Sequence, residues 1–417
     1  MKNIVVLGSG FGGIRAALEA NNRLPSSGWQ VVVIDRRTFH TFSPILYEVA
    51  TAYSQIEPKS GVENRDLDSA LAEDVCVPLR EVFRNTNIQV VHDEIIKIDV
   101  VSKKIETKDG NVIPYEFCVS ALGTEAFFFG IEGAESNSYP LKSFEDGLKI
   151  REKLRMMIGD MANKKKHIIV VGGGPSGVEV IAEMAGFIRK TCRQYGIASS
   201  DVALTLMEAQ SGILAGFSKS FIDTVENRLK VFNINIRTNM HIARVTPSSV
   251  VLDNGEEVGA DIILWSAGVQ TPAVVIGADL RQDNRHRIVV DDYLRAQGHE
   301  DFFAIGDNSL FFDKKRNMPA SGTAFVAIEE GKVAAENILR TITCKPLKPY
   351  DFFAPVYVAP IGGKYAVANV FGYTLSGLFA WVFRVAIDFR YYSSIFSYPR
   401  ALKLILRGVW MFSRNDG

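Results

Sequence analysis

Hydrophobic residues in this chain fall into short β-branched runs that alternate with longer segments of helical periodicity. Helical patterns follow two glycine clusters and recur near 143–160, 177–195, 218–230 and 323–341. The strand-like runs cover 3–7, 30–34, 88–91, 95–98, 112–119, 167–171, 202–207, 234–237, 250–252, 261–265 and 302–305. Strands that alternate with helices predict an α/β chain built on parallel sheets.

Two of the strand-like runs end in a glycine cluster that opens a helix. Residues 4–16 are IVVLGSGFGGIRA, and residues 168–180 are IIVVGGGPSGVEV. In such a G-x-G-x-x-G turn, the first glycine permits the bend and the second lets the backbone approach a pyrophosphate. The third lets the helix pack closely on the strand. The glycines concerned are Gly8, Gly10 and Gly13 in the first cluster, and Gly172, Gly174 and Gly177 in the second.

Each glycine turn has an acidic partner at the end of the next strand. Asp35 ends QVVVID, 22 residues after Gly13, and Glu208 ends ALTLME, 31 residues after Gly177. A carboxylate there accepts hydrogen bonds from ribose hydroxyls, and it favours NADH over NADPH because it repels a 2′-phosphate. The sequence therefore predicts two dinucleotide sites.

The two glycine turns belong to a longer unit that occurs twice. DGNVIPYEF (109–117) and DNGEEVGADIIL (253–264) each give a turn and a strand, followed by the small-residue exits SALGT and WSAGV. The simplest explanation is a flavoprotein in which one site binds FAD and the other a nicotinamide. Asp307, which ends the strand in DFFAIGDNS (301–309), is then expected to bind ribityl hydroxyls and the pyrophosphate region of FAD.

Composition narrows the class of protein further. The 417 residues are 47% hydrophobic and 23% charged, with 47 basic and 47 acidic side chains, so no net charge favours nucleic acid. From residue 372 onward there are six basic and two acidic residues. The four cysteines are scattered without a C-x-x-C pair, which favours a reducing compartment and argues against a dithiol-based disulfide reductase. We expect no metal site, signal peptide or membrane-spanning helix.

At this point the sequence resembles the type II NADH dehydrogenases, the single-subunit NADH:quinone oxidoreductases, across nearly its whole length. The matching segments are VVLGSGFGGIRAA, HTFSPILYEVATA (40–52), CVSALGT (118–124), VVGGGPSGVEVIAEMA (170–185), ILWSAGVQTP (263–272) and FAIGD (303–307). The resemblance implies two Rossmann-type domains, as in glutathione reductase, and a C-terminal helical membrane-binding segment. The expected domains are FAD-binding 1–125 and 273–345, NADH-binding 126–272, and C-terminal 346–417.

The resemblance also implies an activity and its residues: hydride passes from NADH to FAD, and two electrons then pass to a membrane quinone without proton pumping. The expected FAD contacts are Gly8, Gly10, Phe11, Gly13, Asp35, Arg36, Pro44, Ala121, Gly123, Asp307, Thr323 and Ala324. The expected NADH contacts are Gly172, Gly174, Gly177, Glu208, Ala267 and Gly268. The expected catalytic residues are Glu179, Thr323, Ala324, Phe325 and Glu329.

Four of these assignments have an alternative. Asp307 could lie in an ordinary turn, because Gly-Asp after a strand is, taken alone, more often a turn. The resemblance implies that the loop with Pro44 and Tyr47 closes over the flavin, although it could be an ordinary buried loop. It implies that Glu179 assists proton movement to quinone, whereas a carboxylate in the first turn of a helix, like Glu183 one turn later, can simply complement the helix dipole. Phe325 could stack on quinone or pack in a core.

The chain departs from the family on the helix expected to meet the flavin ring. The family has the pattern TAQxAxQQG there, with two glutamines lining the quinone side, but residues 323–331 are TAFVAIEEG. Phe325 and Glu329 stand in place of those glutamines. The helix N-terminus can still stabilise an anionic reduced flavin, while the polar lining of the acceptor site differs.

The tail predicts a membrane interface. We expect an apolar helix over 373–389, interrupted by an Arg384/Asp388 pair, and then an amphipathic helix in RALKLILRGVWMFSR. Its basic stripe is Arg400, Lys403, Arg407 and Arg414, and its apolar face is Leu402, Ile405, Val409 and Phe412. Basic amphipathic helices with tryptophan suit the surface of an anionic membrane. The alternative is a helix that packs against another domain or a dimer partner.

The expected protein is therefore a peripheral enzyme on the cytoplasmic face of the membrane, forming a homodimer. Two other functions fit the same architecture. A sulfide:quinone oxidoreductase would need a close cysteine pair beside the flavin. A flavoprotein that senses NADH, like the apoptosis-inducing-factor proteins, would change conformation on reduction instead of turning over a quinone.

Overall fold

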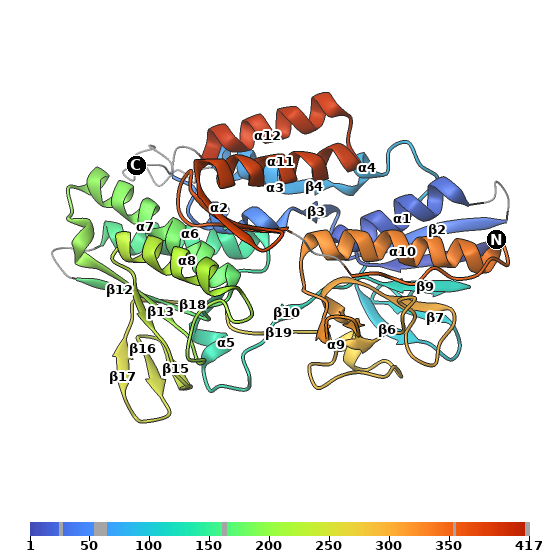
Figure 1. Ribbon diagram of the computed structural model, residues 1–417, viewed down its shortest axis with the longest axis horizontal. Coiled ribbons are helices and arrows are strands. Elements are labelled where there is room, and N and C mark those ends of the chain that lie inside the picture. The colour runs from blue at the N-terminus through green and yellow to red at the C-terminus, as the bar shows by residue number, and fades with distance from the viewer. Residues whose placement is uncertain (25–27, 54–64, 161–164, 353–355, 413–417) are drawn as a thin grey trace. The chain divides into compact units, whose positions relative to one another are not determined.

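The computed structural model describes residues 1–24, 28–53, 65–160, 165–352 and 356–412 (Figure 1). The contacts within the chain define two compact units. The first unit consists of Met1–His40, Val77–Glu125 and Val269–Ala354, and the second consists of Thr41–Cys76, Ala126–Gly268 and Pro355–Gly417. Each unit contains one of the predicted glycine turns.

A parallel five-stranded sheet forms the centre of the first unit. Its strands, in spatial order, are β21 (Phe302–Ala304), β9 (Phe117–Ser120), β1 (Lys2–Leu7), β2 (Trp29–Asp35) and β5 (Gln89–His92). The middle strand β1 is apolar from Ile4 to Leu7, and these four side chains are completely buried. A strand covered on both faces needs such a continuous apolar run, which is why the sequence signal was strong here.

Helices α1 (Phe11–Arg23) and α10 (Ala324–Ile342) pack side by side in this unit (Figure 1). Their closest approach is at two glycines, because a Cβ at Gly331 would lie 2.5 Å from the carbonyl oxygen of Gly12. A Cβ at Gly12 would in turn lie 2.9 Å from the carbonyl oxygen of Ala327. This backbone contact sets the position of α10 relative to the first glycine turn.

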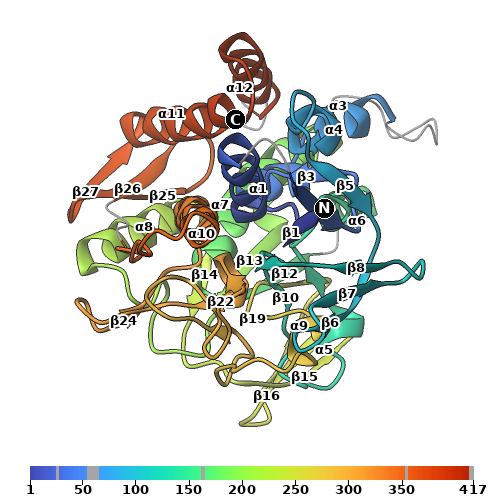
Figure 2. The same cartoon turned by 90° about the vertical axis from the view of Figure 1, so that its right-hand side faces the viewer.

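The remaining elements of the first unit are short. An antiparallel sheet of β6 (Ile95–Asp99), β7 (Lys104–Thr107) and β8 (Val112–Pro114) follows β5 (Figure 2). The expected single strand over 112–119 is therefore wrong: the chain leaves β8 at Pro114 and starts β9 at Phe117. The smaller elements are α4 (Leu79–Val82), α9 (Ala273–Ile276), β20 (Ile288–Val289), β22 (Ser309–Leu310), β23 (Phe312–Asp313) and β24 (Met318–Pro319).

The second unit repeats this order of elements. Its parallel sheet has the order β11 (Tyr139–Pro140), β18 (Ile262–Trp265), β12 (Lys166–Val171), β13 (Val202–Met207) and β14 (Asn235–Arg237). Its helices are α6 (Phe144–Gly159), α7 (Pro175–Tyr195) and α8 (Lys219–Val231), and its antiparallel ribbon is β15 (Ile242–Thr246), β16 (Ser249–Leu252) and β17 (Glu257–Gly259). The α/β class with two Rossmann-type sheets is confirmed.

The C-terminal segment adds a β-meander and two helices to the second unit. Strands β25 (Val356–Pro360), β26 (Ala366–Val370) and β27 (Tyr373–Gly377) are antiparallel, and α11 (Leu378–Ile395) and α12 (Tyr398–Phe412) follow. The same unit contains the turn η1 (Ser43–Ile45) and helices α2 (Leu46–Ala50) and α3 (Arg65–Val75). The expected helix over 373–389 is wrong at its start. Residues 373–377 pair with β26, and Gly377, at φ +89°, separates strand from helix.

Short elements complete the chain. They are β3 (Phe39–Thr41), β4 (Cys76–Pro78), β10 (Glu125–Ala126), α5 (Ala134–Asn137), η3 (Ser199–Asp201), β19 (Val269–Gln270) and η4 (Gly306–Asn308).

The glycine contact between α1 and α10 predicts a measurable loss of stability. Gly331→Ala places a methyl group against the backbone of Gly12, so the helices must separate, at a cost of about 1–3 kcal/mol in the free energy of unfolding. The control is Gly159→Ala, also in a helix, where the nearest atom outside the helix backbone is 3.7 Å away and alanine has the better helix propensity. Urea unfolding measures both variants. Equal stability of the two would contradict the packing argument.

Candidate active site

The first glycine turn links β1 to α1 and is closed by backbone contacts. Gly8 has a φ of +92°, and a Cβ there would lie 2.6 Å from the carbonyl oxygen of Ala121. A Cβ at Gly13 would overlap the carbonyl oxygen of Gly8. None of the described atoms lies within 4 Å of a Cβ at Gly10. The turn is therefore closely packed at Gly8 and Gly13 and open at Gly10, where a pyrophosphate can meet the N-terminus of α1.

Asp35, the last residue of β2, holds this turn. Its Oδ2 accepts hydrogen bonds from the Ser9 backbone N–H at 2.7 Å and from the Ser9 hydroxyl at 2.6 Å. Its Oδ1 accepts from the backbone N–H of Arg37 at 2.8 Å. A carboxylate has about four lone-pair positions, so Asp35 can still accept from a ribose hydroxyl.

Residues near this turn differ in their exposure. Arg36 is exposed, and its Nη2 lies 3.5 Å from Glu125 Oε1. Phe11 meets the edge of the His40 ring at 4.8 Å between centroids. Burial lowers the pKa of His40 to about 4, and its Nδ1 lies 3.0 Å from the carbonyl oxygen of Ser9. His40 is thus a neutral, structural side chain of the turn.

The segment Val269–Ala354, by which the chain returns to the first unit, brings a second acidic group to that unit. We call it the return segment. Asp307 lies in η4 with an exposed side chain, and the preceding Gly306 donates its N–H to Glu330 Oε2 at 2.6 Å. Burial raises the pKa of Glu330 to about 8, so this carboxyl group carries a proton at neutral pH. We did not predict Glu330 from the sequence. The signal was present, because Glu330 stands where the pattern TAQxAxQQG has its last glutamine, and a protonated carboxyl is close to an amide in shape.

The N-terminus of α10 carries the expected flavin-facing residues. The Thr323 side chain caps the helix by accepting from the backbone N–H of Val326 at 3.3 Å. Ala324 and Phe325 begin the helix, and Phe325 is partly exposed, so it is not a core residue. Glu329 forms an ion pair with Lys332 at 2.7 Å.

The second glycine turn, between β12 and α7, has the same construction. Gly172 has a φ of +105°, and a Cβ there would lie 2.7 Å from the backbone nitrogen of Ala267. A Cβ at Gly177 would overlap the carbonyl oxygen of Gly172, while none of the described atoms lies within 4 Å of a Cβ at Gly174. Gly268, after β18, has a φ of +75°, and a Cβ there would lie 2.5 Å from the Phe129 ring.

Glu208, directly after β13, repeats the role of Asp35. Its Oε2 accepts from the backbone N–H of Gly173 at 2.6 Å, and its Oε1 accepts from Gln210 N–H at 2.8 Å. In both units the acid therefore bonds the residue that follows the first glycine. Two cradles with a fixed turn, an open second glycine and an acid at the ribose position fit two dinucleotides.

The structure distributes the predicted site residues between the two units. The first unit contains Gly8, Gly10, Phe11, Gly13, Asp35, Arg36, Ala121, Gly123, Asp307, Thr323, Ala324, Phe325 and Glu329. The second unit contains Pro44, Gly172, Gly174, Gly177, Glu179, Glu208, Ala267 and Gly268. Among the described residues, no cluster of histidine, cysteine and acidic side chains could hold a metal ion.

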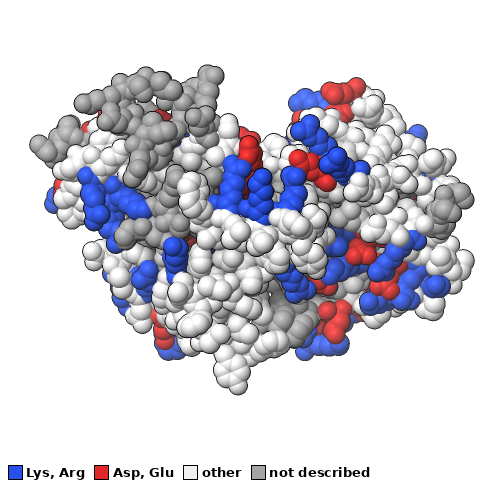
Figure 3. Space-filling model, turned by 90° about the horizontal axis from the view of Figure 1, so that it is seen from above, with Lys and Arg blue, Asp and Glu red and all other residues white. Residues whose placement is uncertain are grey.

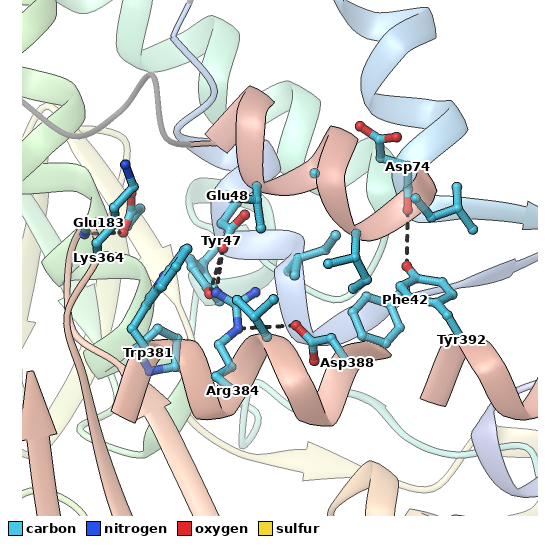
Figure 4. A pocket seen from close by; sticks show the side chains of 18 residues that line it. Phe42, Tyr47, Glu48, Asp74, Glu183, Lys364, Trp381, Arg384, Asp388 and Tyr392 are labelled. Carbon is cyan, nitrogen blue, oxygen red and sulfur yellow. Dashed lines mark hydrogen bonds and ion pairs between the residues drawn. The ribbon is translucent and has the colours of Figure 1, made fainter. Parts of the chain in front are cut away.

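A pocket in the second unit lies between the C-terminal helices and the segment 42–48 (Figure 4). Its cavity measures about 60 Å³. Tyr47, Glu48, Arg384 and Asp388 form a polar end. The remaining lining residues are Phe42, Ile45, Asp74, Glu183, Pro360, Gly363, Lys364, Trp381, Val385, Tyr392, Leu404, Ile405, Gly408 and Val409.

Arg384 is the centre of the polar end. Its Nη1 donates to Glu48 Oε1 at 2.8 Å, and its Nε lies 3.4 Å from Asp388 Oδ2 (Figure 4). The Tyr47 hydroxyl also donates to Glu48 Oε1, at 3.0 Å. Burial opposes the charge on Arg384, but Tyr47, Glu48 and Asp388 hold its pKa well above the usual value. Burial raises the pKa of Asp388 to about 6, against the effect of Arg384.

Glu179 lies on the first turns of α7, between the second glycine turn and this cluster. Burial raises its pKa to about 8, against the charge of Arg384, although its side chain keeps some contact with solvent. The structure thus couples Glu179 electrostatically to Arg384 and Glu48. The sequence contained no sign of a role for Glu48, which is one residue of the segment PILYEVATA. It indicated Arg384 and Asp388 only as a pair on one helix.

The chain matches known proteins over most of its length. The model of the family described as pyridine nucleotide-disulphide oxidoreductase covers residues 2–331. Type II NADH:quinone oxidoreductases from Staphylococcus saprophyticus and Staphylococcus aureus are each 25% identical over 403 residues, which is 93% of this chain and 94% of the relative.

Two solved structures show the same fold over nearly the whole chain. NDH2 from Plasmodium falciparum, in complex with NADH, has a TM-score of 0.80 at 19% identity, covering 99% of this chain and 97% of that one. The sulfide:quinone oxidoreductase of Aquifex aeolicus has a TM-score of 0.76 at 20% identity, covering 100% and 92%. Because the family model spans both glycine turns and the return segment with Asp307, the chain belongs to the pyridine nucleotide-disulphide oxidoreductase family.

Proposed function

We propose that this protein is a type II NADH:quinone oxidoreductase that transfers two electrons from NADH through FAD to a membrane quinone without pumping protons. The observation that carries the proposal is the pairing of two dinucleotide cradles with a partly polar pocket beneath two apolar C-terminal helices. The alignment with the staphylococcal type II enzymes covers 93% of the chain, so it extends beyond residue 331 into this C-terminal segment.

The cysteines argue against sulfide chemistry, although a sulfide:quinone oxidoreductase shares the fold. All four cysteines are free. Burial raises the pKa of Cys118 well above its usual value and that of Cys192 to about 11, so both thiols stay protonated. Cys118 and Cys192 also lie in different units. A thiol is nucleophilic as the thiolate, and these two are therefore inert.

In this protein, bound FAD would accept a hydride from NADH and supply two electrons to the quinone. The first unit would hold FAD by the open backbone at Gly10 and by the carboxylates of Asp35 and Asp307, and the N-terminus of α10 would supply N–H groups to stabilise negative charge on the flavin. The second unit would hold NADH by the open backbone at Gly174 and by Glu208.

Glu179 has the properties of a proton carrier for this reaction. Quinone reduction to quinol takes up two protons, so the acceptor side needs a group that holds a proton at neutral pH and can release it. A pKa of about 8 meets that condition. A solvated carboxylate that only complemented the α7 dipole would not be protonated at neutral pH, because the dipole favours the charged form.

The C-terminal helices present an apolar surface suited to a membrane. The exposed large hydrophobic residues on this segment are Phe371, Tyr373, Leu375, Leu378, Phe379, Val382, Phe383, Ile387, Tyr398, Leu402, Leu406 and Trp410. Figure 3 shows the molecule from the side on which α11 and α12 lie in Figure 1, and much of that surface carries no charged side chain. Many exposed large apolar side chains on one segment are typical of an interaction site.

The structure corrects the apolar face predicted for α12. Leu402 is exposed as expected, but Ile405 and Val409 line the pocket, and the outward positions are Leu406 and Trp410. The side chain of Phe412 lies outside the described residues.

The basic stripe of α12 is also corrected. Arg407 forms ion pairs with Glu73 and Asp74 of α3, so its charge is balanced within the protein and its side chain is only partly exposed. Arg400 and Lys403 are exposed, and Arg414 lies outside the described residues. Apolar contact therefore has a larger share in the proposed membrane binding than the sequence pattern indicated.

The proposed attachment is peripheral. Among the described helices, none is both long and apolar enough to cross a bilayer. The cytoplasmic face and the homodimer stay predictions.

The proposed activity predicts the behaviour of the flavin in an anaerobic stopped-flow experiment. NADH should bleach the flavin of the purified protein rapidly, and a ubiquinone or menaquinone analogue should restore the oxidised spectrum within the same turnover time. Slow reoxidation with a persistent charge-transfer band would favour the NADH-sensing alternative. Bleaching without any effect of quinones would contradict the proposal.

Glu208 should set the choice of nicotinamide. The wild-type protein should prefer NADH, and Glu208→Gln should reduce the ratio of kcat/KM for NADH to that for NADPH by about tenfold or more, because a like charge beside the 2′-phosphate is removed. Glu135→Gln, at an exposed acid in the same unit, is the matched control. A wild-type protein that used both cofactors equally would contradict the assignment.

The exposed face of α11 should bind vesicles. Phe379→Ser with Phe383→Ser removes two large apolar side chains, each contributing about 1.5–3 kcal/mol on burial, so co-sedimentation with anionic vesicles should weaken more than tenfold. Met156→Ser with Val231→Ser, two exposed residues on α6 and α8, is the control and should bind like the wild type. Equal binding by both double variants would show that α11 is not the membrane contact.

A further inference from the structure

The polar end of the pocket contains three charged side chains whose burial needs an explanation. Arg384, Glu48 and Asp388 are buried together, with side-chain exposures of 12%, 9% and 12%. Arg384 and Asp388 belong to α11, whose opposite face is apolar and exposed, and Glu48 belongs to α2. Replacing a buried ion cluster by apolar residues is often neutral or stabilising. Packing alone therefore gives no reason for three charged side chains at this position.

The N–H donors of Arg384 are also not all bonded to acceptors in the described part of the protein. A guanidinium has five N–H donors, and the acceptors of Arg384 among the described residues are Glu48, bonded to Nη1, and Asp388, which lies near Nε. The ring of Tyr47 lies 5.8 Å from the guanidinium carbon and confines it on one side. No described acceptor takes the Nη2 hydrogens, and the guanidinium borders the cavity (Figure 4).

Apart from Asp74, Glu183 and Lys364, the rest of the pocket is mainly apolar, which suits an amphiphile. Trp381, Leu404, Ile405 and Val409 line it with apolar surface, and they belong to the two helices that carry the exposed apolar residues. A ligand with a polar carbonyl and a hydrocarbon tail satisfies both ends. The cavity measures about 60 Å³, so only the carbonyl edge of a quinone would enter it, and the rest of the ring would stay outside.

We propose that Arg384 donates a hydrogen bond from Nη2 to a carbonyl oxygen of the quinone and is a specificity-determining residue of the acceptor site. This inference rests on the proposed NADH:quinone activity. Glu48 and Asp388 hold the guanidinium in place: their bonds to Nη1 and Nε fix its plane, and their charges allow the cation to stay buried. The site then selects acceptors that present a carbonyl oxygen over acceptors that only take electrons.

The test removes Arg384 together with the charges of its two acids. The reference is the wild-type protein, because Glu48→Gln with Asp388→Asn alone would leave the Arg384 cation buried without its counter-charges. The triple variant combines Glu48→Gln, Asp388→Asn and Arg384→Met, and it removes the donor without leaving a buried charge unpaired. Arg390→Met, at an exposed arginine on the same helix, is the matched control. Each protein is assayed for kcat and KM with a short-chain quinone and for its rate with ferricyanide, which has no carbonyl group.

The expected result is a rise of about tenfold or more in KM for quinone between the reference and the triple variant, because a hydrogen bond from a charged donor is lost. The ratio of quinone to ferricyanide rates should fall with it. Arg384→Lys should recover part of the affinity, since it keeps the charge but loses the planar fork. Arg390→Met should match the wild type. Where the triple variant does not fold, the Lys variant and its KM carry the comparison.

Two results overturn the proposal in different ways. An unchanged KM for quinone in the triple variant, or an equal loss with quinone and ferricyanide, would make Arg384 a structural residue while leaving the proposed activity intact. A wild-type protein that reduces ferricyanide but no quinone would reject the proposed activity, and this inference with it.

Discussion

The architecture depends on the contact between the first and third glycines of each nucleotide turn. At Gly13 and at Gly177, any side chain would collide with the carbonyl oxygen of the glycine that begins the turn. This contact brings the N-terminus of the following helix to the end of the first strand. The acid at the end of the second strand then bonds the turn through Ser9 or Gly173. Both cofactor cradles follow from this one constraint, and a second glycine contact, between Gly331 and Gly12, positions α10 on α1.

The second unit combines its nucleotide turn with a buried group of charges. Glu179 begins to titrate near neutral pH because it is buried, while Arg384 and Glu48 act on it in opposite directions. Arg384 reaches this position from a helix whose other face is apolar and exposed. One helix therefore has two faces, an exposed apolar face that we propose contacts lipid and an inner face that lines a partly polar pocket. This arrangement links the proposed membrane attachment to the proposed electron acceptor.

Sequence patterns predicted the repeated core well, because its signals are local. Strands β1 and β12 are continuous apolar runs, and both are followed by glycines whose spacing is set by the turn itself. The acids Asp35 and Glu208 stand at strand ends, which the same pattern locates. Prediction failed where pairing with a distant partner decided the outcome. Residues 373–377 are apolar enough for a helix, but β26 offers them an antiparallel neighbour, and they form a strand.

The sequence by itself determined the α/β class, the two dinucleotide turns and the acids that serve them, since each depends on residues close together in the chain. Only the tertiary structure decided which side chains of the tail face inward. The sequence pattern placed Arg407 in a basic stripe, but in the structure Arg407 forms ion pairs with Glu73 and Asp74 of α3. Glu48 and Arg384 are separated by 336 residues, and their ion pair exists because the fold brings the Arg384 side chain of α11 within reach of α2. Periodicity gives the faces of a helix, but the neighbour that covers a face is chosen by the fold.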